Sequence, residues 1–263
     1  MADNNEDDFH EGDGLRLELA WLLREEVHGV LERVSQTLVE CSRRFPFRIG
    51  SDDESLVRPQ RILLSSPNNG TGQIKCVVTL LGDTICDADI NFKHKLGKDH
   101  NMFKTAINPG SQWKLQQVQD AGNHLHNAIS LLNGVDKAYT FSSSQQVIML
   151  LDELMKNLNQ GRNQIAFPKR KSIEELLNNR NLETLQPPVP SNVTLSFYTH
   201  ASKIILALYQ LQHTVTGTEI ASRQQVECTV KWLNEAMILF TLALQQCQQL
   251  RDKVTVLQQC EDT

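Results

Sequence analysis

The residues from Trp113 to Leu132 constrain the fold of this 263-residue chain more than any other stretch. Along it, apolar residues and one glycine recur at alternating spacings of three and four residues: Leu115, Val118, Gly122, Leu125, Ile129 and Leu132. This spacing places them on one narrow face of a helix, like the a and d positions of a coiled coil. Since none of them is chemically reactive, the pattern favours a helix that packs as a scaffold over one that supports catalysis.

Three further stretches show the same spacing and predict helices at about 15–44, 200–214 and 228–258. In the second of them the spaced residues are Ala201, Ile204, Leu208, Leu211 and Val215. Each helix alone would leave an apolar stripe exposed, so we expect all of them to share one core with the 112–133 helix. The result would be an antiparallel four-helix bundle built from N-terminal, middle and C-terminal helices.

Strand-like segments separate these helices. Arg61–Ser65, Gln73–Leu81 and Thr84–Lys93 are rich in β-branched or alternating residues and predict an antiparallel meander. Two capping boxes, Ser143 with Gln146 and Ser172 with Glu175, predict the starts of two more helices.

The predicted fold class is therefore α+β, with a smaller lobe that holds the antiparallel sheet and the short helices. We expect the domains to be discontinuous in the sequence. They comprise a disordered acidic arm at 1–14, a bundle at 15–47, 111–134 and 198–260, and a β-containing lobe at 55–108 and 137–197.

Composition argues against several functions. A net charge of −5 and 6% aromatic residues disfavour nucleic-acid binding, which needs clustered cations and stacking rings. The longest apolar run, Ala236–Leu244, is far shorter than the roughly 20 residues that span a bilayer, so no direct membrane insertion is expected. The cysteines form no C-x-x-C pair, and we expect all to be reduced in the cytoplasm: Cys41, Cys76, Cys86, Cys228, Cys247 and Cys260.

Residues that could bind a metal or catalyse a reaction have simpler interpretations. Cys76, Cys86, His94 and His100 are too irregularly spaced for a typical zinc site. His124 and His126 lie two residues apart on a helix, where they face different directions and are expected to be solvated.

Asp87 and Asp89 share one strand face, which could bind a cation but is more simply a polar outward face. Nothing else in the sequence matches a hydrolase, zinc-protease or nucleotide-binding motif. We therefore predict no catalytic residues, no metal and no cofactor.

Lys169–Lys171 is a short basic cluster beside Ser172. It could be a nuclear signal or a kinase site, although a solvated loop is the simpler interpretation. The helical seams could also form a dimeric leucine zipper, but the basic helix that a DNA-binding zipper needs does not precede them. Packing inside the monomer is the better interpretation, with homodimerisation as the alternative.

Several stretches resemble the Rogdi family of leucine-zipper-like proteins. They lie in the same order over about residues 15–257: Trp21–His28, Gln112–Asp120 with Asn123, His124, Ala128 and Ile129, Leu208–Leu211, and Val226–Cys228 through Trp232–Ala236 to Cys247–Lys253. The segment between His213 and Val226 is shorter than in some members, and the tail after Lys253 lacks an aromatic ending.

The resemblance implies a two-lobed protein without catalytic residues. It also implies an adaptor role like that of the small subunit of the regulator of vacuolar H⁺-ATPase assembly, a rabconnectin complex in animals. The implied partners are WD-repeat rabconnectin-type subunits and the soluble sector of the V-ATPase, with a link to synaptic vesicles in neurons. We expect a cytoplasmic monomer that is peripheral on vesicles through its partners. The alternative is a homodimerising protein with a nuclear or signalling role.

Overall fold

The computed structural model describes residues 14–45, 58–66, 74–96, 99–215 and 217–261. The chain divides into two compact units. We call Met1–Ser42, Asn123–Arg162 and Ile238–Thr263 the helical unit, and Arg43–Gly122 with Asn163–Met237 the strand unit. The predicted disordered arm lies, except for residue 14, outside the described residues.

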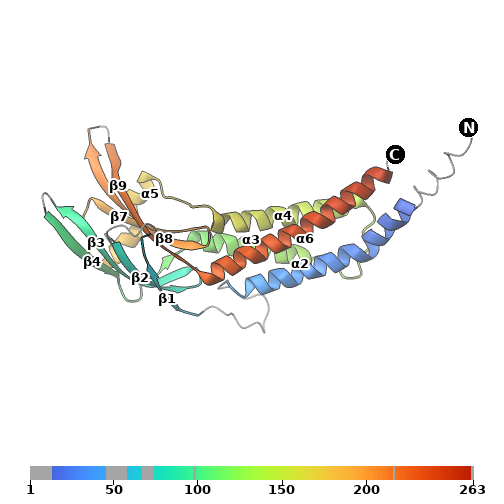
Figure 1. The fold of residues 1–263 in the computed structure, drawn as a ribbon, viewed down its shortest axis with the longest axis horizontal. Coiled ribbons are helices and arrows are strands. Elements are labelled where there is room, and N and C mark those ends of the chain that lie inside the picture. Colours follow the sequence, from blue (N-terminus) through green and yellow to red (C-terminus); the bar gives the residue numbers. More distant parts are fainter. Residues whose placement is uncertain (1–13, 46–57, 67–73, 97–98, 216, 262–263) are drawn as a thin grey trace, which may run out of the picture. The chain divides into compact units, whose positions relative to one another are not determined.

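The long helices of the chain supply the helical unit (Figure 1). Their bounds are η1 Leu22–Glu26 (a π-helical turn), α2 Val27–Ser42, α3 Gln116–Asn133, α4 Ser144–Ala166 and α6 Lys231–Glu261. The start of α3, the end of α4 and the start of α6 belong to the strand unit. The seam predicted from Leu115 to Leu132 is buried along its whole length.

Burial of the first helix does not follow the predicted phase. Leu19 and Leu22 are buried before Val27, whereas the three- and four-residue spacing that leads to Val27 runs through Ala20 and Leu23. The reason is the π-helical turn η1, which adds one residue to a helical turn. The extra residue moves the apolar stripe by one position, and the pattern regains its predicted phase from Val27 onward.

Two antiparallel sheets make up most of the strand unit. The first has the order β1-β2-β3-β4-β6, with β5 paired to β3: β1 Gln60–Leu64, β2 Ile74–Leu81, β3 Thr84–Leu96, β4 Asp99–Ile107, β5 Trp113–Lys114 and β6 Leu185–Gln186. The second has the order β7-β8-β9: β7 Val193–His200, β8 Lys203–Thr214 and β9 Gly217–Thr229. Ser65 and Glu227 exchange two backbone hydrogen bonds of 3.1 and 2.9 Å and connect the sheets. The predicted meander is thus confirmed as β1, β2 and β3.

The short helical elements lie between β4 and β7 in the sequence. They are α5 Ile173–Leu177 and the 3₁₀ turn η2 Arg180–Thr184. The Ser172 hydroxyl accepts from the Glu175 N–H, and the Ser172 N–H donates to the Glu175 carboxylate. This capping box is one of the two predicted from the sequence. Leu176 of α5 packs in a buried cluster with Tyr198, Ile205 and Tyr209 on the second sheet.

The predicted bundle helix at 200–214 is wrong, because this segment forms strand β8. β8 is the central strand of its sheet, and six consecutive residues, Ile204–Tyr209, are buried. A strand buried on both faces reads as a continuous apolar run, which contains helix-like spacings by chance. The β-branched pair Ile204 and Ile205 was the signal that favoured a strand.

The α+β class stands, but the four-helix bundle with a smaller β lobe does not. The bundle lacks its predicted 200–214 helix, and α6 begins at Lys231 because the preceding residues extend β9. The strand unit is also the larger of the two units.

The turn between β7 and β8 has two residues, Ala201 and Ser202, with φ angles of 48° and 62°. Positive φ at both positions is typical of the hairpin turn that fits twisted strands, but it normally selects Gly or Asn. Backbone hydrogen bonds hold the turn from both sides: Ala201 N–H donates to Ala166 O, and Val230 N–H donates to Ser202 O.

Candidate binding site

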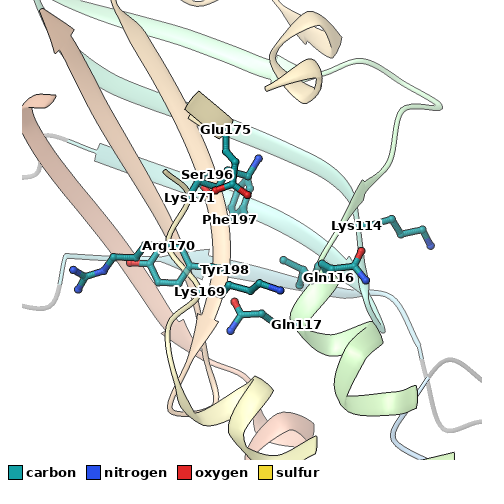
Figure 2. A pocket seen from close by; sticks show the side chains of 11 residues that line it. Lys114, Gln116, Gln117, Lys169, Arg170, Lys171, Glu175, Ser196, Phe197 and Tyr198 are labelled. Carbon is teal, nitrogen blue, oxygen red and sulfur yellow. The ribbon is translucent and has the colours of Figure 1, made fainter. Parts of the chain in front are cut away.

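A pocket of about 270 Å³ lies within the strand unit, beside the outer edge of β7 (Figure 2). Its lining comes from β5 and the start of α3, from the segment between α4 and α5 together with α5 itself, and from β7. The lining includes Gln117, Lys169, Lys171, Glu175, Ser196 and Phe197.

The basic cluster predicted from the sequence, Lys169–Lys171, forms one wall of this pocket. Figure 2 shows Arg170 extending away from the other side chains, while Lys169 points toward Gln117. Lys169 Nζ lies 3.7 Å from a carboxylate oxygen of Asp120, and Lys171 Nζ donates to Asn179 Oδ1 at 3.1 Å. Burial removes water from the Lys171 ammonium and lowers its pKa.

Glu175 is the acidic group of the pocket wall. The hydrogen bond from the Ser172 N–H to its carboxylate, 2.7 Å long, lowers the pKa of Glu175 below its usual value. The carboxylate therefore stays charged and is already engaged in the capping box. Its charge partly offsets that of Lys171.

Gln117 joins three elements at the base of the pocket. Its amide nitrogen donates to the carbonyl oxygens of Gln164 and Phe167 at 2.7 and 2.8 Å, at the end of α4. It also lies 3.2 Å from Thr199 O, while Thr199 N–H donates to Gln117 Oε1 at 2.9 Å. The side chain is 5% exposed. Gln117 thus pairs with the edge of β7 as a neighbouring strand would, and it caps the α4 carbonyls.

Ser196 is the one serine in the pocket lining, but no described group activates its hydroxyl. It is 2% exposed, and its Oγ has no hydrogen-bond partner among the described residues. A nucleophilic serine needs a base within hydrogen-bond reach. The arrangement therefore suits binding through donors rather than covalent catalysis.

The residues weighed for zinc do not come together in the part of the chain that is described. Cys76 is buried and Cys86 half-buried, while the side chains of His94 and His100 lie outside the description. No group of three or more His, Cys, Asp or Glu residues that could bind a metal occurs among the described residues. Burial raises the pKa of the Cys76 thiol, and that of Cys247 to about 12, so both stay protonated and unreactive.

The paired histidines lie on α3 and the paired aspartates on β3. His126 is exposed and His124 half-buried on α3. On β3, Asp87 is exposed and Asp89 half-buried, beside a register shift at Thr79 and Leu80 of β2. None of these side chains lines the pocket.

The sequence did not single out Gln117, Ser196 or Phe197. A glutamine in the first helical turn and a serine within a strand are common in proteins, so no spacing marks them. Only the basic cluster beside Ser172 pointed to this region.

Among the helices of the described residues, none is both long and apolar enough to cross a membrane.

Comparison with known proteins gives a consistent result over most of the chain. The family model described as "Rogdi leucine zipper containing protein" matches residues 18–225. Protein rogdi of Drosophila melanogaster is 40% identical over 242 residues, which are 92% of this chain and 88% of that protein. The human Protein rogdi homolog is 33% identical over 268 residues, covering 92% of both chains. The Caenorhabditis elegans homolog is 27% identical over 209 residues.

Proposed function

This chain belongs to the family of Rogdi leucine zipper containing proteins, and from that membership we propose that it is a non-enzymatic adaptor in proton-pump assembly. In this role it is a subunit of a rabconnectin complex, which helps the soluble sector of the V-ATPase to rejoin its membrane sector. The protein then acts in the cytoplasm, at vesicle surfaces that its partners recruit it to, including synaptic vesicles in neurons.

The chemistry of the described residues supports an adaptor. The Ser196 hydroxyl in the pocket has no base, and the buried thiols of Cys76 and Cys247 stay protonated. What the pocket offers instead is a set of hydrogen-bond donors and cations, which suits recognition of another protein. This donor-rich pocket is the structural observation on which the proposal depends most.

The burial of the helical seam disfavours the dimeric-zipper alternative. Leu125, Ile129 and Leu132 are 7% exposed or less within the single chain. A seam that is already covered cannot form a zipper with a second copy unless the unit opens. Partner binding should therefore use groups outside the seams.

A pull-down tests the proposal. The tagged full chain, expressed in cells that contain the pump, is expected to recover WD-repeat rabconnectin-type subunits and, more weakly, soluble-sector subunits of the pump. The matched control is the same chain with Leu125→Asp, which should misfold and recover neither. If the wild-type chain recovers no more of these subunits than the control, the adaptor proposal is wrong.

A further inference from the structure

The outer edge of β7 shows which of its backbone groups are free. Gln117 pairs with the N–H and C=O of Thr199, and Asn179 Nδ2 donates to Leu195 O at 2.8 Å. These bonds point away from β8, and in an antiparallel pair the outward direction recurs at every second residue. The N–H and C=O of Phe197, midway between Leu195 and Thr199, therefore also point outward.

Nothing in the described chain occupies this backbone position. Phe197 lines the pocket, and among the described residues no group outside the sheet bonds to its N–H or C=O. Gln117 and Asn179 cover the neighbouring positions on the edge. A long added strand is therefore blocked, but one peptide unit can pair with Phe197.

Besides the Phe197 N–H, the pocket holds a second hydrogen-bond donor without an acceptor. Ser196 Oγ is buried and unpartnered although the residue lines the pocket. A buried hydroxyl without a partner destabilises a protein, and native structures satisfy most such groups. A ligand oxygen at this point would supply the missing acceptor.

Two lysines beside these donors, Lys169 and Lys171, favour a negatively charged ligand. Lys171 is half-buried, and its ammonium donates a hydrogen bond to the neutral amide of Asn179. Lys169 is more exposed and only loosely paired with Asp120, at 3.7 Å. Glu175 opposes them, but its carboxylate is engaged with Ser172. An additional anion can therefore be bound by both lysines.

We propose that this pocket binds an acidic residue of a partner protein, whose carboxylate reaches Lys169, Lys171 and Ser196 while its own peptide unit pairs with Phe197. The inference rests on the proposed adaptor function and names the chemistry of the contact. The free C=O of Phe197 needs a donor from the ligand. A peptide N–H supplies one, whereas the phosphodiester group of a lipid has none, and this favours a peptide over a lipid phosphate.

The probe is a fluorescein-labelled hexaglutamate peptide, titrated with the full chain and followed by fluorescence anisotropy. We expect saturable binding that weakens as salt is added, because exposed charges are screened. Lys171→Gln should weaken binding about tenfold or more, since it removes a charge-assisted hydrogen bond. Lys75→Gln changes an exposed lysine of β2 outside the pocket, and should leave affinity within about twofold.

Ser196→Ala separates a binding role from a structural one. Because its hydroxyl is unsatisfied in the free chain, removing it should leave the melting temperature unchanged or raise it. The same change should weaken peptide binding several-fold. The proposal would be overturned if wild-type and Ser196→Ala bound the peptide with equal affinity. It would also be overturned if Lys171→Gln and Lys75→Gln lost peptide affinity equally.

Inorganic phosphate and vesicles of phosphatidylcholine with phosphatidylserine serve as competitors. Pocket-dependent binding of either, without binding of the peptide, would also overturn it.

The pull-down distinguishes this proposal from the adaptor function. If Lys171→Gln recovers the pump and WD-repeat subunits as well as the wild type, the pocket proposal fails and the adaptor function stands. If the wild type recovers none but binds the peptide through the pocket, the adaptor function fails and the pocket chemistry stands.

Discussion

The helical unit and the strand unit are stabilised in different ways. The helical unit buries apolar seams, such as Leu125 and Ile129 of α3, and its ion pairs lie nearer the surface, as between Lys253 and Glu26 at 2.6 Å. The strand unit also buries apolar residues, but two polar side chains, Gln117 and Asn179, complete its hydrogen bonding along the edge of β7.

This difference shows where a binding function can arise. A seam of apolar side chains has no groups left to offer once it is packed. A strand edge that side chains cover only in part leaves one backbone position, Phe197, available to a ligand. Each unit should therefore lose stability when the groups that hold it together are changed.

The largest effect is expected from Leu125→Asp in the helical unit. Leu125 is 0% exposed, and a buried unpaired carboxylate should destabilise the chain by about 4 kcal/mol or more. Hydrogen exchange should become faster throughout the helical unit. Asn127→Asp, an exposed position of the same helix, is the control. A stable Leu125→Asp variant would show that the seam does not hold the unit together.

Gln117→Leu, in the strand unit, should cause the next largest loss of stability. The change removes the partner of the buried Thr199 N–H and a donor to the part-buried carbonyl groups of Gln164 and Phe167, which should destabilise the chain by about 3 kcal/mol. Urea denaturation measures the loss, with Gln116→Leu as the exposed control. A loss below that of the control would mean that the amide does not secure the β7 edge.

Ser172→Ala should have a smaller effect, of about 1 kcal/mol, because it removes one side of the capping box of α5. Ser65→Ala is a suitable control, since the hydrogen bonds between Ser65 and Glu227 join backbone groups. Equal melting temperatures for Ser172→Ala and the wild type would contradict a stabilising cap.

The smallest effect is a gain in stability. Ala201→Gly places a residue without Cβ at φ 48° and should stabilise the chain by up to about 1 kcal/mol, although the extra freedom of glycine in the unfolded chain offsets part of this. Differential scanning calorimetry measures the change. Ala236→Gly, inside α6, should lower the melting temperature instead. A clear loss in Ala201→Gly would show that the turn is unstrained.

The sequence predicted features whose cause is local. The α3 seam, the Ser172 capping box and the β1–β3 meander all follow from spacing or turn chemistry within a few residues. The missed features depend on tertiary position. β8 reads like a helix because both of its faces are buried, and η1 shifts the apolar phase without any residue that marks a π-helical turn.

The candidate site was even less predictable. Lys169–Lys171 was noticed as a basic cluster, but its pocket forms only when this segment lies beside β7. The role of Gln117 depends on three acceptors that follow it in the sequence by 47, 50 and 82 positions. No pattern in a single sequence predicts that Gln117 contacts these acceptors, because the contacts are fixed by the fold as a whole.

The central claim, that the protein promotes assembly of the proton pump, is tested most directly by vesicle pH. Cells depleted of the protein should show a higher vesicle pH by ratiometric fluorescence while total pump subunits stay constant, since assembly rather than synthesis fails. Re-expression of the wild-type chain should restore acidification, and Leu125→Asp should not. A normal vesicle pH in fully depleted cells would contradict the account.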